Sequence, residues 1–151
     1  MHTVLLVDDD DHLLHGLVRA LRHQPYRVYT ARSGEEAMAI LKSRTVDLVV
    51  TDERMNGMSG TDLAAWIARE LPDRMRIILT GNASAATAIR AINEGRVHRF
   101  LTKPCDAVQL AMVIRKALEE KDQLEQTRRV LEAIGEGEHL IPSPSGTWLL
   151  E

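Results

Sequence analysis

The chain has 151 residues, of which 44% are hydrophobic and 27% charged, a composition typical of one soluble globular domain and unlike that of a disordered or fibrous chain. Its 19 lysines and arginines against 22 aspartates and glutamates give a net charge of −3, so bulk electrostatics favour neither nucleic acid nor anionic lipid as a partner. No apolar run approaches the ~18 residues of a membrane span, and residues 1–7 are too short for a secretory signal. We therefore expect a cytoplasmic protein with no nucleic-acid or membrane partner, which its single cysteine, Cys105, also suits.

Apolar runs typical of strands alternate along the chain with stretches of helical spacing. The predicted strands are residues 3–7, 26–30, 46–51, 75–80 and 97–102, and the predicted helices are residues 10–23, 34–43, 61–71, 84–94 and 106–134. Ser33 followed by Glu36 fits a capping box at the start of the second helix. The alternation indicates a parallel α/β sheet.

The predicted strands differ in polarity. The first, third and fourth are continuously apolar, as are strands covered by helices on both faces, whereas the second (YRVYT) and the fifth (VHRF) contain polar residues. We therefore place the second and fifth strands at the edges. The resulting order is 2-1-3-4-5, in a doubly wound, flavodoxin-like (βα)5 three-layer sandwich, whose ligands bind beyond the carboxyl ends of strands one and three.

The last predicted helix is longer than the sheet requires. An apolar position recurs in it every seven residues, at Leu110, Ala117, Leu124 and Leu131. This spacing would allow pairing with another helix. The residues that come four positions after Ala117 and Leu124, where a second apolar position would be needed for pairing, are the charged Lys121 and Arg128. A solvated helix end stabilised by ion pairs is therefore the alternative.

Glycine, proline and serine dominate the sequence from residue 135 onward. This composition predicts a flexible tail over residues 135–151. We expect the domain to occupy residues 1–120 and a helical extension to occupy residues 121–134. The extension and tail are too short for a DNA-binding or catalytic output module.

Acidic side chains directly continue two of the predicted strands. Asp8 and Asp9 follow the first strand and Asp52 follows the third, while Thr80 ends the fourth and Lys103 follows the fifth. Because the carboxyl ends of parallel strands share one edge of a sheet, these side chains should meet there. A run of four acids is also typical of a solvated helix N-terminus, but crowded carboxylates usually indicate raised pKa values or a bound cation.

The residue types at this edge suit phosphoryl chemistry. Oxygen-only ligands favour Mg²⁺, which keeps room for waters and phosphate oxygens. A carboxylate can act as a nucleophile toward phosphorus, and the transfer mainly needs positioning and charge neutralisation, for which Lys103 offers an ammonium group. The cluster therefore contains the parts needed to accept a phosphoryl group on an aspartate beside Mg²⁺.

Four ordered segments, VLLVDDDD, DLVVTDERMNGMSG, IILTGN and RFLTKP, resemble those of bacterial two-component response regulator receiver domains, which are CheY-like. The resemblance covers the predicted domain. It implies that a sensor histidine kinase phosphorylates Asp52 and that Lys103 binds the phosphate. It also implies that Asp8, Asp9 and Asp52 hold Mg²⁺ together with the backbone carbonyl of Arg54.

The resemblance further implies a switch made of Thr80 and Phe100. On phosphorylation the Thr80 hydroxyl would move to a phosphate oxygen and Phe100 would turn into the vacated space, changing the face formed by the fourth helix, fifth strand and fifth helix. The Lys103-Pro104 peptide would be cis. By the same resemblance, Arg54 and Asn82 would occupy positions that tune the loss of the phosphoryl group.

The leading hypothesis is a receiver that relays its state to an unknown downstream protein and is no enzyme beyond assisting its own phosphorylation and dephosphorylation. A homodimer, through the fourth helix, fifth strand and fifth helix or through the C-terminal helix, is a further hypothesis. A phosphatase is disfavoured because Arg54 stands where an acid-base aspartate would be needed. Two more functions stay open: a scaffold that is never phosphorylated, and a receiver related to regulators of cyclic-dinucleotide phosphodiesterases, which residues 91–106 (AINEGRVHRFLTKPCD) resemble.

Overall fold

The structure is a computed structural model of the chain and describes residues 1–81, 84–135, 140–142 and 148–150. It divides into two compact units, Met1–Leu118 and Glu119–Glu151. Among the described residues, no helix has both the length and the apolar character needed to cross a bilayer.

Strands and helices alternate through the first unit, as predicted. The elements are β1 His2–Val7, α1 Asp11–Leu21, β2 Tyr26–Ala31, α2 Gly34–Ser43, β3 Leu48–Thr51, α3 Gly60–Glu70, β4 Met75–Thr80, α4 Ala85–Asn93, β5 Arg99–Thr102 and α5 Ala107–Gly135. The four strand pairings are all parallel and give the order β2-β1-β3-β4-β5. The predicted strand order, with β2 and β5 at the edges, is therefore confirmed.

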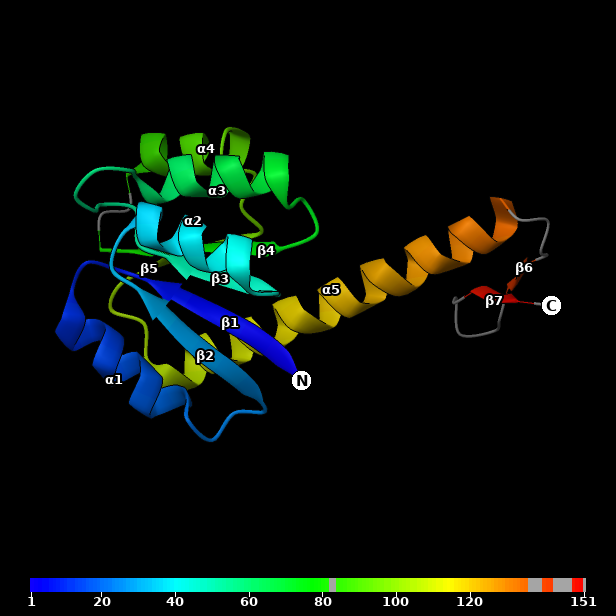
Figure 1. The fold of residues 1–151 in the computed structure, drawn as a ribbon, viewed down its shortest axis with the longest axis horizontal. Coiled ribbons are helices and arrows are strands. Elements are labelled where there is room, and N and C mark those ends of the chain that lie inside the picture. The colour runs from blue at the N-terminus through cyan, green and yellow to red at the C-terminus, as the bar shows by residue number, and fades with distance from the viewer. Residues whose placement is uncertain (82–83, 136–139, 143–147, 151) are drawn as a thin grey trace. The chain divides into compact units, whose positions relative to one another are not determined.

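The sheet is covered on both faces, as Figure 1 shows, with α2, α3 and α4 on one side and α1 and the start of α5 on the other. The apolar cluster under α1 and α5 contains Leu14, Leu21, Leu110 and Ile114. The cluster under α2 and α3 contains Ala37, Leu41, Leu63 and Ile67. Because strand side chains alternate between faces, β1 contributes Leu6 to the first cluster and Leu5 to the second, and both are buried.

Side chains cap the first four helices. Asp10, Ser33, Ser59 and Ser84 each accept a hydrogen bond from the amide three residues later. The capping box predicted at α2 is only half formed, because the Glu36 carboxylate accepts from the amide of Arg32 and not from that of Ser33. These caps fix where each helix begins relative to the preceding strand.

The amino-terminal rim of the sheet, defined here by Asp47, Arg76 and His98, explains why two strands begin later than predicted. The Asp47 amide donates to the Thr3 carbonyl at 2.9 Å, but the amide of Thr3 donates to the Asp47 carboxylate at 2.7 Å in place of a backbone carbonyl, and β3 begins at the next residue, Leu48. The His98 Nδ1 atom accepts from the amide of Arg76 at 2.9 Å, in the place of a ladder carbonyl, so β5 begins at the next residue.

Arg76 is 6% exposed and bonds three backbone carbonyls at this rim. Its Nε atom donates to the carbonyl of Arg96 at 3.2 Å, and its Nη1 atom donates to those of Pro72 at 3.3 Å and Arg74 at 2.6 Å. Burial lowers the pKa of the Arg76 guanidinium, and the charge of Arg96 lowers it further. The side chain thus ties the loop before β4 to the loop before β5.

The second unit contains the later part of α5 and two short antiparallel strands, β6 Leu140–Pro142 and β7 Trp148–Leu150, which the sequence did not predict. Lys121 and Glu125 form an ion pair on the helix. Of the seven-residue apolar repeat, Leu110 and Ala117 are buried in the first unit, whereas Leu124 and Leu131 are exposed. Much of the predicted flexible tail lies outside the described residues, so that expectation stays a prediction.

Candidate functional site

The aspartates of interest directly follow the two central strands β1 and β3. In the parallel register Val7 is the partner of Thr51, so the next residues, Asp8 and Asp52, lie side by side. The amide of Asp52 donates to the carbonyl of Val7 at 2.9 Å and extends the ladder by one bond. The apolar strands therefore fix both carboxylates at the point where the chain connections diverge to opposite faces, which is where such sheets bind ligands.

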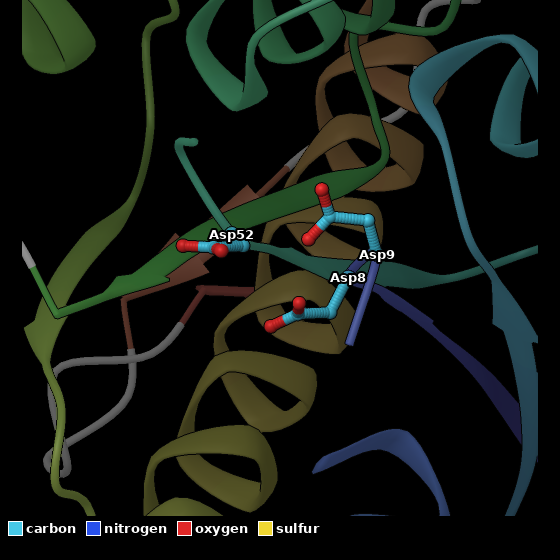
Figure 2. Close-up of side chains that lie close together, drawn as sticks. All are labelled: Asp8, Asp9 and Asp52. Carbon is cyan, nitrogen blue, oxygen red and sulfur yellow. The ribbon is translucent and has the colours of Figure 1, made fainter. Parts of the chain in front are cut away.

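Three carboxylates converge at this carboxyl rim, defined here by Asp8, Asp9, Asp52, Thr80 and Lys103. Carboxylate oxygens of the three aspartates lie within 4.8 Å of one another (Figure 2). Asp8 is 4% exposed and Asp52 is 9% exposed, whereas Asp9 is exposed. Two of the three negative charges are thus largely removed from water, where their mutual repulsion is least screened.

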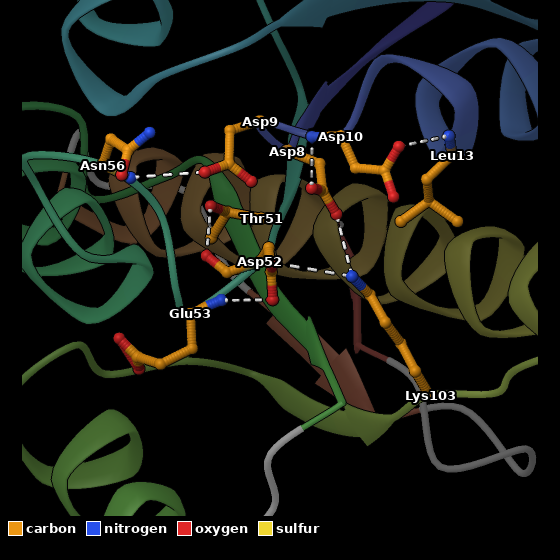
Figure 3. A network of polar contacts seen from close by, with 9 residues as sticks. All are labelled: Asp8, Asp9, Asp10, Leu13, Thr51, Asp52, Glu53, Asn56 and Lys103. Atoms are coloured by element: carbon orange, nitrogen blue, oxygen red, sulfur yellow. Dashed lines mark hydrogen bonds and ion pairs between the residues drawn. The ribbon is translucent and has the colours of Figure 1, made fainter.

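Lys103 provides the cation in this cluster. Its Nζ atom lies 2.9 Å from Asp8 Oδ2 and 3.5 Å from Asp52 Oδ2 (Figure 3). The amide of Lys103 donates to the carbonyl of Thr80 at 2.8 Å, and the Lys103-Pro104 peptide is cis, as the resemblance implied. The ammonium therefore reaches the carboxylates from the end of β5, a strand that does not border β1 or β3.

Charge at the rim is unbalanced. Burial raises the pKa of Asp8 and repulsion by Asp52 adds to this, although hydrogen bonds from Asp10 and Lys103 oppose it. Burial alone would lower the pKa of Lys103, but its hydrogen bond to Asp8 and the charge of Asp52 raise it overall. One ammonium is too little to neutralise three carboxylates, so the rim favours the arrival of a further cation.

The donor set fits Mg²⁺. The cluster offers only oxygen atoms, and Mg²⁺ is bound by a small number of carboxylates with waters and phosphate oxygens completing its shell. One oxygen of Asp9 accepts from the amide of Asn56 at 3.3 Å, which joins the loop after β3 to the rim (Figure 3). The Arg54 carbonyl belongs to the same loop, and its role as a ligand stays a prediction.

The two residues of the expected switch occupy different depths. Thr80 ends β4, is buried, and pairs in register with Thr102, the residue before Lys103. Phe100 lies half-buried in the edge strand β5, in register with Ile78. Asn82, expected to tune loss of the phosphoryl group, lies outside the described residues.

Glu53 is a polar residue of the site that the sequence did not reveal. Its amide donates to Asp52 Oδ1 at 2.8 Å (Figure 3), and its own carboxylate is buried. An acid next to another acid at a strand end is normally solvated, so nothing in its position predicts burial. Its partner proves to be Thr61, which becomes adjacent only when the loop of residues 54–59 closes.

The family model of the response regulator receiver domain matches residues 4–115. The transcriptional regulatory protein GlrR of Escherichia coli (strain K12) is 44% identical over 117 residues, which are 78% of this chain and 26% of GlrR. The sensor kinase CckA of Brucella abortus is 38% identical over 122 residues, which are 80% of this chain and 13% of CckA. The chain thus spans about a quarter or less of the length of these relatives.

Solved structures agree with these matches. The signal receiver domain of an HD domain-containing protein from Pseudomonas fluorescens Pf-5 superposes with a TM-score of 0.79 at 36% identity, covering 83% of this chain and 92% of that one. A CheY-like response regulator receiver domain protein from Methanospirillum hungatei has a TM-score of 0.78 at 26% identity over 82% of this chain and 98% of that one. The fold, the sequence matches and the acidic rim agree: the chain belongs to the response regulator receiver domain family of two-component systems.

Proposed function

We propose that this receiver takes a phosphoryl group onto Asp52 from a sensor histidine kinase, with Mg²⁺ held by Asp8, Asp9, Asp52 and the Arg54 carbonyl. The observation that carries the proposal is the convergence of three carboxylate groups within 4.8 Å beside one ammonium at the carboxyl rim. Membership of a family that receives signals from histidine kinases supports the choice of phosphoryl donor.

In the proposed reaction a carboxylate oxygen of Asp52 attacks phosphorus. An oxygen–phosphorus bond forms while the bond from phosphorus to the donor's imidazole nitrogen breaks, and that nitrogen keeps the electron pair. The amide of Glu53 and the ammonium of Lys103 already contact the Asp52 carboxylate, so its orientation requires little rearrangement. Lys103 would then bind a phosphoryl oxygen, and bound Mg²⁺ would supply neutralisation of the other phosphoryl charge.

The phosphorylated state would be relayed by Thr80 and Phe100. Thr80 is joined to Lys103 through the bond between the Lys103 amide and the Thr80 carbonyl, so its position is tied to that of the ammonium. Movement of the Thr80 hydroxyl toward the phosphoryl group would free space for the half-buried Phe100 ring. The face of α4, β5 and α5 would change shape as a result.

The surface that carries this signal would contact a downstream protein or a second copy of the chain. On α4, the apolar side chains Ile89 and Ile92 are exposed, which suits a contact surface on that face. The exposed Leu124 and Leu131 of α5 support the alternative, pairing through the C-terminal helix. Size-exclusion volume before and after phosphorylation distinguishes a homodimer from a relay to another protein.

The test of the proposed function is intact mass spectrometry after incubation with Mg²⁺ and acetyl phosphate. One phosphoryl group should appear on the wild type, none after EDTA, and none on Asp52→Asn. Asp122→Asn, which changes an exposed aspartate of α5, is the matched control and should be phosphorylated normally. A wild type that stays unmodified would contradict the proposal and favour a scaffold, while rapid multiple turnover of acetyl phosphate would favour an enzyme.

A further inference from the structure

Glu53 directly follows Asp52, yet its carboxylate is turned into the protein, where the residue is only 8% exposed. Both of its oxygens are bound by one residue, Thr61, in the first turn of α3. The Thr61 amide donates to Glu53 Oε1 at 3.0 Å, and the Thr61 hydroxyl donates to Glu53 Oε2. A buried carboxylate is unfavourable unless its oxygens accept hydrogen bonds. Thr61, which is itself buried, supplies a hydrogen bond to each oxygen of Glu53.

The start of α3 also presses against the backbone that carries the phosphoryl acceptor. The amide of Gly60 donates to the Glu53 carbonyl at 3.0 Å. A Cβ atom at Gly60 would lie 2.1 Å from the carbonyl oxygen of Asp52, so only glycine allows this approach. Backbone contact and the side-chain pair together fix Glu53 relative to α3.

Glu53 passes this constraint to the reacting carboxylate. Its amide donates to Asp52 Oδ1 at 2.8 Å, so the direction of the Glu53 N–H sets the direction of the Asp52 side chain. The chain of contacts is therefore short: Thr61 holds the Glu53 carboxylate, and the Glu53 amide holds the Asp52 carboxylate.

The same contacts extend to α4. A Cβ atom at Gly95, just after α4, would lie 3.4 Å from the Thr61 carbonyl oxygen, which shows how closely the two segments approach. Next to Thr61, Asp62 forms a 2.9 Å ion pair with Arg90 of α4. The pKa of Arg90 is raised, first by its hydrogen bond to Asp62, with the charge of Glu53 among the further causes. Thr61 thus lies between the segment of Asp52 and Glu53 and helix α4.

We propose that Glu53 and Thr61 are positioning residues for phosphoryl transfer to Asp52. The inference rests on the proposed function, because it concerns the reaction at that aspartate. An apolar pair of similar volume would hold α3 against β3 equally well, since a buried charge contributes little net stability. What the polar pair adds is a fixed direction for the Glu53 amide, and hence for the carboxylate that attacks phosphorus.

The test compares Thr61→Val, which keeps the shape and the amide but removes the hydroxyl, with Thr61→Ser, which keeps the hydroxyl. Phosphorylation rates are measured with Mg²⁺ over a range of acetyl phosphate concentrations and normalised to the folded fraction. We expect Thr61→Val to lower the maximal rate constant about tenfold, because misorientation of the nucleophile acts on the reacting geometry and not on donor binding. The half-saturating acetyl phosphate concentration should stay the same, and Thr61→Ser should restore the rate.

Glu53→Met is the second variant and guards against a folding defect in the first. Its side chain has a similar length but cannot replace the carboxylate as acceptor for the Thr61 N–H and hydroxyl, so the same loss of maximal rate is expected. Thr127→Val, at an exposed threonine of α5, should react like the wild type. If the wild type is phosphorylated and both Thr61→Val and Glu53→Met match its rate, the positioning role is refuted. If the wild type is not phosphorylated at all, the proposed function fails first.

Discussion

The two rims of the sheet both carry charged side chains, but the partners of those charges differ. At the amino-terminal rim, Arg76 donates to three backbone carbonyls and the carboxylate of Asp47 accepts from a backbone amide. At the carboxyl rim, Asp8 and Asp52 also accept from backbone amides, but they face each other and share the ammonium of Lys103. The charge of Arg76 is directed at the backbone, whereas the carboxylates of the carboxyl rim are directed at one another and at an ammonium as well.

This difference indicates which rim can act on a ligand. The buried guanidinium of Arg76 donates to three backbone carbonyls, so its hydrogen bonds stabilise the fold. Carboxylates held together in excess of their counter-ions destabilise the apo protein and gain most from a cation and a phosphoryl group. Burial alone does not distinguish the two rims, because Arg76, Asp8 and Asp52 are all buried.

The largest effect is expected at the amino-terminal rim. Arg76→Met keeps much of the aliphatic stem but leaves three carbonyls without their donor, so the free energy of unfolding should fall by about 3 kcal/mol. Urea denaturation measures this change, with Arg27→Met at an exposed position of β2 as the matched control. The folded fraction should still be phosphorylated on Asp52. A loss below about 0.5 kcal/mol would mean that the rim is not a structural anchor.

At the carboxyl rim, by contrast, removal of a charge is expected to raise the unfolding free energy. Burial and the charge of Asp52 disfavour ionised Asp8, so Asp8→Asn should raise the unfolding free energy in metal-free buffer by about 1 kcal/mol. Mg²⁺ should stabilise the wild type, because it binds only the folded state, and should stabilise Asp8→Asn less. Thermal unfolding with EDTA and with Mg²⁺ gives both quantities. A destabilised Asp8→Asn protein that still responds fully to Mg²⁺ would show that Asp8 is structural.

The smallest effect on stability is expected at Tyr26, the first residue of β2. Unlike the charged groups of the two rims, it carries a buried polar group without a partner among the described residues. Its buried hydroxyl has no hydrogen-bond partner among the described residues, so Tyr26→Phe should stabilise the protein by about 0.5 kcal/mol. Tyr29→Phe is the control and should not stabilise, since the Tyr29 hydroxyl accepts from Arg44 at 3.1 Å.

Tyr26 also predicts a pH dependence. Burial raises its pKa from 10.0 to about 12. Because the folded-state value lies above the unfolded one, the protonated hydroxyl favours folding, and this contribution is lost as pH rises from about 10 to 12. Tyr26→Phe should therefore lose less stability than the wild type across that interval. Equal losses in both proteins would place the Tyr26 hydroxyl in water.

Most of the fold could be predicted because apolar periodicity is local. The runs that became β1, β3 and β4 are buried on both faces, and their continuous apolar residues indicate this burial directly. The site residues followed from strand order, since Asp8 and Asp52 each come directly after a central strand. The predicted strand starts at residues 46 and 97 were too early because side-chain atoms of Asp47 and His98, in place of backbone carbonyls, accept from the amides of the neighbouring strands, which composition does not reveal.

The rest depends on contacts between segments distant in the sequence. The pairing of Glu53 with Thr61 exists only after the intervening loop closes and Gly60 reaches the Asp52 carbonyl. The three carbonyls bound by Arg76 come from two separate loops, so its burial could not be predicted from β4. The strands β6 and β7 lie in a segment whose glycine and proline content is typical of a loop.

The central claim is that the carboxyl rim accepts the phosphoryl group while the amino-terminal rim is structural. Amide chemical-shift mapping on addition of Mg²⁺ and beryllofluoride, a mimic of the phosphoryl group, tests it most directly. The account predicts large shifts at Asp9, Glu53 and Lys103, small shifts at Arg76 and His98, and no beryllofluoride response in Asp52→Asn. Wild-type protein without shifts around Asp52, or with the same response after Asp52→Asn, would contradict it.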